Sequence, residues 1–246
     1  MLLKANLHLH TREDKIEGFA IQYSIYEAID RAAAYGFSVL ALTGHQKCLF
    51  REEYGVYAAN RKIKLIPGVE LFLRSSWRRN DVLVLNCQPD IEKIKNLPDL
   101  RAYKNEHPEI FVIAPHPFYG LFSSLGGHNL QANLDIFDAI EHSWYYSAWF
   151  NPNRPASAAA RAAGKPLIAT SDSHTLRFLN DDYITIDAAS WDCPDLFAAL
   201  RANRFSLSTR EKNGFELLWL ARHEWALIKG YVRQTAARWP NFFQHE

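Results

Sequence analysis

The chain has 246 residues, of which 48% are hydrophobic and 22% are charged, and its formal net charge is +1 at pH 7. This hydrophobic fraction supports a sizeable core and argues against intrinsic disorder. A net charge near zero gives no overall field for nucleic acid or an anionic membrane, although a local cluster of charge can still bind a phosphate.

The cysteines and the hydropathy pattern bear on the cellular compartment. Cys48, Cys87 and Cys193 are odd in number and widely spaced, so they predict neither a disulfide framework nor a CxxC zinc motif. Reduced thiols are typical of a cytosolic protein, and we therefore expect a cytoplasmic location. The first apolar stretch is too short for a signal peptide, and no run reaches the roughly 18 apolar residues of a membrane span.

Short apolar runs alternate with stretches of helical periodicity along most of the chain. The predicted strands are residues 2–10, 38–43, 64–73, 81–86, 110–114, 137–142, 166–171, 183–186 and 205–208. The predicted helices are residues 24–35, 52–62, 91–106 (broken by Pro98), 155–163, 194–202 and 215–239. We expect 81–86 to pair with 64–73 as a hairpin, and the Ser- and Gly-rich segment 121–129 to form a loop. Repeated strand–helix units predict an α/β fold with a parallel sheet covered by helices, and their number favours a barrel.

Residues of metal-ligand type lie at or near the ends of successive predicted strands. They are His8, His10, His45, Glu70, His116, His142, Asp172 and His174. In parallel α/β folds the carboxyl ends of the strands meet at one rim, where active sites form. Neutral imidazoles and carboxylates suit zinc, manganese or iron, and a carboxylate can bridge two ions. The pattern therefore predicts a divalent metal centre.

Each residue also has an ordinary structural interpretation. A single His-x-His pair, or a loop histidine such as His116, occurs in many proteins without a metal. Glu70 lies between Val69 and Leu71 in an apolar strand, where an unpaired buried carboxylate is costly and needs either a metal or an arginine. The joint occurrence at strand ends, more than any one residue, favours metal binding.

Six short motifs occur in the order and with the approximate spacing of a known family. They are NLHLHT at 6–11, GFSVLALTGH at 36–45, IPGVEL at 66–71, APHPF at 114–118, DAIEHS at 138–143 and ATSDSH at 169–174. The set resembles the PHP (polymerase and histidinol phosphatase) family over residues 1–210. The resemblance implies a distorted (βα)7 TIM-like barrel with up to three metal ions, and we expect residues 211–246 to form a C-terminal helical extension packed on it.

The resemblance also implies roles for individual residues. His8, His10 and Asp172 look like ligands of a first metal, and Glu70 like the bridge to a second metal held also by His116. His45 and His174 look like ligands of a third, with an acid from the loop after the first strand. Asp14 is the first choice for that acid and Glu17 the second.

Three positions depart from the family pattern. Gly44 stands where an aspartate usually precedes the histidine of the second motif. Asp81 stands where many relatives carry a histidine, so it either binds metal or leaves that position empty. His142 replaces an apolar residue and is interpreted as an extra ligand, a proton donor or a pocket residue. We assign catalytic roles to His142 and His174.

The expected function is hydrolysis of a phosphate ester by a metal-activated water, with two or three zinc, manganese or iron ions as cofactors. The expected partner is a small phosphorylated substrate or a nucleotide, and the sequence predicts no oligomeric state. One alternative is hydrolysis of a carbon–nitrogen or carboxylic ester bond, as in amidohydrolases, which the lack of a lysine at a predicted strand end disfavours. Another is a barrel that has lost catalysis and acts as a metal-binding regulatory or interaction module.

Overall fold

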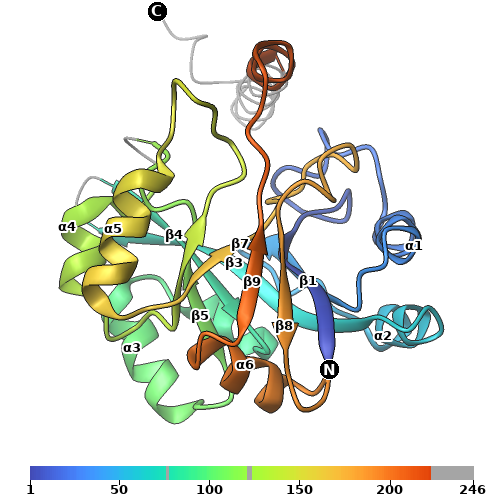
Figure 1. The fold of residues 1–246 in the computed structure, drawn as a ribbon. Coiled ribbons are helices and arrows are strands. Elements are labelled where there is room, and N and C mark those ends of the chain that lie inside the picture. The colour runs from blue at the N-terminus through green and yellow to red at the C-terminus, as the bar shows by residue number, and fades with distance from the viewer. Residues whose placement is uncertain (76–77, 121–123, 223–246) are drawn as a thin grey trace, which may run out of the picture.

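The computed structural model describes residues 1–75, 78–120 and 124–222. Its strands form one sheet in the order β7-β6-β5-β4-β3-β2-β1-β8-β9. An isolated bridge between Leu9 and Ser173 joins the chain after β7 back to β1, so that the sheet nearly closes on itself (Figure 1). The predicted α/β TIM-like barrel is therefore confirmed.

Strands and helices alternate over the first two thirds of the chain. The strands are β1 (Leu2–Leu9), β2 (Val39–His45), β3 (Lys64–Ser75), β4 (Arg78–Leu85), β5 (Phe111–Ala114), β6 (Ala139–His142), β7 (Leu167–Ala169), β8 (Tyr183–Asp187) and β9 (Phe205–Ser208). The helices are α1 (Ile25–Ala34), α2 (Glu52–Ala59), the 3-10 turn η1 (Pro89–Lys93), α3 (Leu97–Glu106), α4 (Gly126–Ala132), α5 (Asn153–Ala163) and α6 (Cys193–Arg201).

The sheet is mixed, which corrects the expectation of a parallel one. β1, β2 and β3 run parallel, as do β5, β6 and β7. β4 is antiparallel to both of its neighbours, and β8 is antiparallel to β1 and β9. A parallel pair needs a long crossover, and the short connection from β3 to β4 leaves room only for the predicted hairpin.

Two local predictions are also corrected. Pro98 lies in the first turn of α3, where the missing N–H costs nothing, and it therefore begins this helix with its N-cap Asn96. The Asn96 carboxamide accepts the Asp99 N–H at 2.8 Å. Helix α4 overlaps the segment 121–129 that was expected to be a loop, and its C-terminal half lies beyond that segment.

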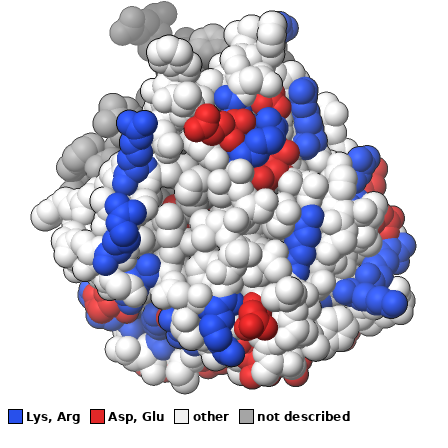
Figure 2. All heavy atoms as spheres, viewed as in Figure 1, with Lys and Arg blue, Asp and Glu red and all other residues white. Residues whose placement is uncertain are grey.

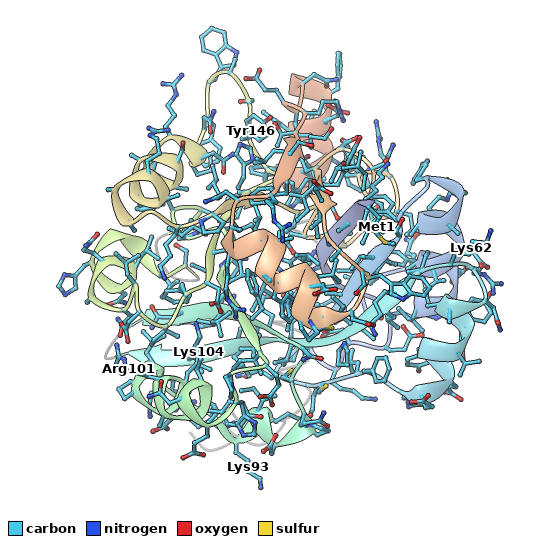
Figure 3. The ribbon with its side chains drawn as sticks, turned by 60° about the horizontal axis from the view of Figure 1, so that its bottom comes forward. Met1, Lys62, Lys93, Arg101, Lys104 and Tyr146 are labelled. Atoms are coloured by element: carbon cyan, nitrogen blue, oxygen red, sulfur yellow. The ribbon has the colours of Figure 1, made fainter. Side chains whose placement is uncertain are left out.

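Apolar side chains fill one end of the barrel. Inward-facing residues of the strands pack with one face of α6, which includes Leu196, Phe197 and Leu200. Seen from below, α6 lies across the barrel (Figure 3). Helices α1 and α2 cover one outer side of the sheet, and α3, α4 and α5 cover the other (Figure 1). The opposite, upper end of the barrel is left for polar side chains.

An irregularity in β1 turns two histidines toward the interior. Leu3, Ala5 and Leu7 belong to the interior cluster, whereas Leu9 packs with the outer residues around α1. The register with β2 shifts between Asn6 and Leu9, which changes the alternation of side chains along the strand. His8 and His10 consequently face inward above the apolar layer.

The chain after β9 begins a further helix at residues 214–222. Asn213 and Glu216 form a reciprocal cap, because the Glu216 N–H donates to Asn213 Oδ1 at 3.0 Å and the Asn213 N–H donates to Glu216 Oε2 at 2.9 Å. Leu220 packs against Trp144 and Phe178 of the barrel. The rest of the predicted helix 215–239 lies outside the described residues, and the domain boundary at residue 210 stays a prediction.

Charged side chains of both signs gather where the chain leaves β9 (Figure 2). Arg210 pairs with Glu216 at 2.7 Å, which ties the start of the new helix to the preceding segment. Within the described ranges, no helix has the length and apolar character needed to cross a bilayer. Cys48, Cys87 and Cys193 carry free thiols.

A buried ion pair below this segment gives a test of the fold. Lys212 Nζ lies 2.7 Å from Asp182 Oδ2, and both side chains are fully buried. Burial raises the pKa of Asp182 to about 7, while Lys212 opposes that rise. We expect Lys212→Met to lower the free energy of unfolding by about 3–5 kcal/mol, because it leaves a buried carboxylate unpaired.

Urea denaturation measures this change, with the exposed Lys93→Met as a control. The double variant Asp182→Asn with Lys212→Met should recover part of the loss. A single variant as stable as the control would show that the ion pair does not hold this segment.

Candidate metal centre

Four ligand atoms converge at the upper end of the barrel. His8 Nε2 and His10 Nε2 lie 3.0 Å apart. Glu70 Oε2 is 3.5 Å from the first and 3.4 Å from the second. Asp172 Oδ1 lies 3.4 Å from each of these two histidine nitrogens. Two ring nitrogens facing each other and two carboxylates are the donor set of a divalent cation site.

Glu70 lies between this group and two further histidines. Its Oε2 is also 3.1 Å from His45 Nε2, and its Oε1 is 3.4 Å from His116 Nε2. Its side chain is 3% exposed, so both oxygens point into the protein. One oxygen therefore faces the histidines of β1 and β2, and the other faces His116, as a bridging carboxylate requires.

The potential ligand atoms of the described residues fall into three groups, each within 4.8 Å. The groups are His8, His10 and Asp172; Glu70, Asp81 and His116; and His10, His45 and His174. These eight residues are brought together from positions up to 166 apart in the chain. Asp14 and His142 belong to none of these groups in the part of the chain that the structure describes.

The electrostatics of the cluster favour positive charge at its centre. Burial opposes protonation of His8, but Asp172, Glu141 and Glu70 raise its pKa to about 10. Burial likewise opposes protonation of His116, whose pKa is raised to about 9, chiefly by Glu70. Conversely, burial disfavours the ionised form of Glu70, but the surrounding histidines hold its pKa well below the usual range. Divalent ions would supply the positive charge that protons otherwise bring, so the residues fit the metal.

Two of the candidate ligands have an unusual backbone. His116 and Asp172, in the turns after β5 and β7, have φ angles of 27° and 40°. Positive φ costs a non-glycine residue roughly 1–3 kcal/mol and is concentrated at functional sites. The His116 N–H donates to Glu141 Oε2 at 2.8 Å, which holds the strained turn in place.

Glu141 is a functional residue that the sequence reasoning missed. It lies in β6 and is 1% exposed, and its Oε1 is 2.9 Å from His8 Nδ1. The Thr170 hydroxyl donates to the same oxygen. A carboxylate on one ring nitrogen fixes the other toward a metal, so Glu141 orients His8. Strand alternation places Glu141 on the same face as Ala139, which packs inside the barrel, but the sequence alone does not say which face of β6 is inward.

His142 has the opposite parity to Glu141 and lies apart from the cluster. Its ring is 5.0 Å from that of Tyr146, and burial lowers its pKa. The geometry gives no support to His142 as a metal ligand, and its catalytic role stays a prediction. His174, the other predicted catalytic residue, is a member of the third ligand group.

The two acids proposed for the third metal have different surroundings. Asp14 Oδ2 accepts the His45 N–H at 2.6 Å and lies 3.0 Å from His45 Nδ1, while its Oδ1 accepts the N–H groups of Ile16 and Glu17. Glu17 Oε2 lies 2.9 Å from His174 Nε2. Its Oε1 lies 4.0 Å from His45 Nε2. The geometry therefore favours Glu17, the second choice from sequence, as the acid of the third group, with Asp14 orienting His45.

The other two departures from the family pattern now have a physical account. A Cβ on Gly44 would lie 2.4 Å from Leu49 Cδ1, so an aspartate there would require the Leu49 side chain to move. Arg79 Nε lies 2.8 Å from Asp81 Oδ1. Burial and Glu70 raise the pKa of Asp81 to about 7, against the effect of Arg79. Asp81 therefore places a carboxylate in the second ligand group, and this carboxylate also pairs with Arg79.

Comparisons with known proteins agree with this arrangement. Residues 150–205 match a family described as PHP-associated. A two-domain protein from Bacteroides vulgatus, described as containing a predicted PHP-like metal-dependent phosphoesterase, superposes with a TM-score of 0.64 at 16% identity over 85% of this chain. The matched segment and the shared fold are in keeping with the PHP resemblance of the sequence motifs. It spans 65% of the length of the Bacteroides protein. No curated protein matches the sequence.

Two further structures have a fold similar to that of this chain. An amidohydrolase from Chromobacterium violaceum superposes with a TM-score of 0.54 at 16% identity, over 82% of this chain and 97% of its own. A lesion-specific endonuclease from Pyrococcus furiosus superposes with a TM-score of 0.59 at 13% identity, over 84% of this chain and 58% of its own. At these identities the likeness concerns the fold.

The contact between Glu141 and His8 predicts a loss of metal affinity. Glu141→Gln should weaken binding of Zn²⁺ or Mn²⁺ by about 10–100-fold, because the His8 ring loses the carboxylate that orients it. Titration calorimetry on protein stripped with a chelator measures this affinity, and Glu106→Gln, an exposed residue, is the matched control. Equal affinity in Glu141→Gln and the control would contradict the orienting role.

The raised histidine pKa values predict a pH dependence of stability. His8, His45 and His116 have pKa values of about 10, 9 and 9 in the folded metal-free protein, above the unfolded value of about 6.5. Their contribution is complete below about pH 6.5 and is lost as the pH rises through about 9–10. Metal-free protein should therefore lose stability from about pH 7 to about pH 10, and metal-loaded protein should lose much less.

Urea denaturation of both forms across this range gives the comparison. Identical pH profiles with and without metal would show that these histidines do not exchange protons for a metal ion.

Proposed function

We propose that this protein is a PHP-type, metal-dependent hydrolase that cleaves a phosphate ester of a small molecule or nucleotide with two or three zinc, manganese or iron ions. The observation that carries the proposal is the position of Glu70, whose two oxygens face different groups of histidines. Paired sites of this kind suit phosphoryl transfer, because two cations clamp the oxygens of the reacting phosphate. Among the structural neighbours, the Bacteroides protein is described as a metal-dependent phosphoesterase and the Pyrococcus protein as an endonuclease, which supports the same chemistry.

The candidate ligands form three sets according to their position in the cluster. His8, His10 and Asp172 would hold one ion, and Glu70 would join it to a second at His116. His45, His174 and Glu17 would hold a third. Bound divalent ions would lower the pKa of a water molecule and neutralise phosphate charge.

Protonation of the leaving oxygen needs a further group near the rim. His174 lies at the edge of the ligand cluster, with its side chain 17% exposed, and is therefore accessible to substrate. His142 lies outside the cluster, beside Tyr146. His174 would fill this role in a protein that holds two metal ions, because its Nε2 cannot both bind a third ion and donate a proton.

A second candidate is hydrolysis of an amide or carboxylic ester. The observation that favours it is the amidohydrolase from Chromobacterium violaceum, which has the same fold. Against it, none of the strands in the described residues ends in a lysine. A barrel that binds metal without catalysis remains the further alternative.

Substrate assays separate these candidates. With Mn²⁺ or Zn²⁺, the protein should hydrolyse 4-nitrophenyl phosphate or bis(4-nitrophenyl) phosphate. Glu70→Gln should lower kcat/KM by at least about a hundredfold, because the carboxylate that faces histidines of all three ligand groups loses its charge. The exposed His128→Ala is the control.

Each other outcome has a distinct meaning. Hydrolysis of 4-nitrophenyl acetate or an anilide, but of neither phosphate ester, would favour the second candidate. Stoichiometric metal binding with no turnover of any substrate would favour the non-catalytic module.

A further inference from the structure

A cavity opens beside the metal centre at His174. It has a volume of about 310 Å³ and is lined by Phe19, Ala20, Gln22, Tyr23, His174, Thr175 and Trp219. Because His174 also belongs to the third ligand group, the cavity begins where a bound phosphate would be held. This volume is near the lower limit of small-molecule sites, roughly 300–1,000 Å³, and suits one ring system more than a polymer.

Aromatic side chains form three of the walls, and contacts with neighbouring groups hold two of them, Tyr23 and Trp219, in place. Tyr23 is 5% exposed, and its hydroxyl donates to the Ser173 carbonyl at 2.7 Å. Trp219 lies 5.7 Å, centroid to centroid, from the buried ring of Phe178. Phe19 and Trp219 are 46% and 36% exposed, so part of each ring is accessible. Walls fixed before binding favour a flat, rigid occupant, because little ordering is needed.

The polarity of the lining does not suit an occupant that carries another charged group besides its phosphate. Apart from His174, the lining residues carry no ionisable side chain other than the Tyr23 phenol. Gln22 and Thr175 offer an amide and a hydroxyl, which are neutral hydrogen-bonding groups. The lining thus matches an uncharged ring, while the neighbouring cluster matches the phosphate.

We propose that this cavity binds the organic part of the substrate, and that it selects a neutral, planar aromatic ring. The proposal rests on the function proposed above and narrows it to small phosphate esters that carry such a ring. Trp219 belongs to the helix that begins after Asn213, outside residues 150–205 that match the PHP-associated family. This helix would thereby contribute to substrate selection.

A pair of esters that differ only in ring planarity tests the proposal. Benzyl phosphate and cyclohexylmethyl phosphate share a primary alkoxide leaving group and a similar size. We expect kcat/KM for the benzyl ester to be higher by about tenfold, because aromatic stacking requires the flat ring. Trp219→Leu and Phe19→Leu should each bring this ratio toward one, and Trp219→Phe should retain most of it.

Phe215→Leu is the matched control, because Phe215 lies in the same helix and is 88% exposed. It should keep the wild-type ratio. An equal kcat/KM for the two esters in the wild-type protein, or a preference that survives in both Trp219→Leu and Phe19→Leu, would overturn the proposal.

Binding of non-hydrolysable analogues separates this proposal from the proposed function. Titration of metal-loaded protein with benzylphosphonate and cyclohexylmethylphosphonate should show the same preference and the same dependence on Trp219. If neither ester is hydrolysed but benzylphosphonate still binds more tightly than cyclohexylmethylphosphonate, the hydrolase function fails and the cavity assignment stands. If both esters are hydrolysed without preference and both phosphonates bind equally, the cavity assignment fails and the hydrolase function stands.

Discussion

The carboxylate of Glu70, buried among histidine rings, is the charge on which the upper end of the barrel depends. A carboxylate that is 3% exposed needs compensating positive charge, because its desolvation is costly. His8, His10, His45 and His116 surround it within 3.5 Å and provide that charge as protonated imidazoles or as metal ligands. These histidines come from β1, β2 and the turn after β5. The site therefore exists only when the sheet has nearly closed.

The two ends of the barrel differ in polarity, and the same strands contribute side chains to both ends. In β3, for example, Ile66 lies in the interior apolar layer and Glu70, four residues later, faces the ligand cluster. In β2, Val39 and Ala41 are interior and His45 follows with the same parity. Along β2 and β3, interior positions thus change from apolar residues to candidate ligands. Helix α6 closes the apolar end, and the cavity at His174 lies at the polar end.

Much of this centre could be predicted from the sequence, because strand ends in such folds meet at one rim and alternate residues share a face. That reasoning places His8, His10, Glu70, His116 and Asp172 together, as the structure does. It does not reveal which of two adjacent residues in β6 faces inward, since a one-residue change in strand position exchanges Glu141 and His142. It also cannot choose between Asp14 and Glu17, because the path of the loop after β1 is set by contacts with His45 and His174. The antiparallel course of β4 and the role of Arg79 beside Asp81 likewise depend on contacts between segments distant in the sequence.

In the proposed function, the cluster would hold the phosphate and the aromatic walls of the cavity would hold the organic group. The most direct test of the central claim is a crystal structure of the protein soaked in Mn²⁺ or Zn²⁺, with anomalous scattering recorded at the edge of that metal. We predict at least two anomalous peaks, one between His8, His10 and Asp172 and one beside His116, with an oxygen of Glu70 directed at each. The absence of any peak within bonding distance of Glu70 at saturating metal would contradict the account.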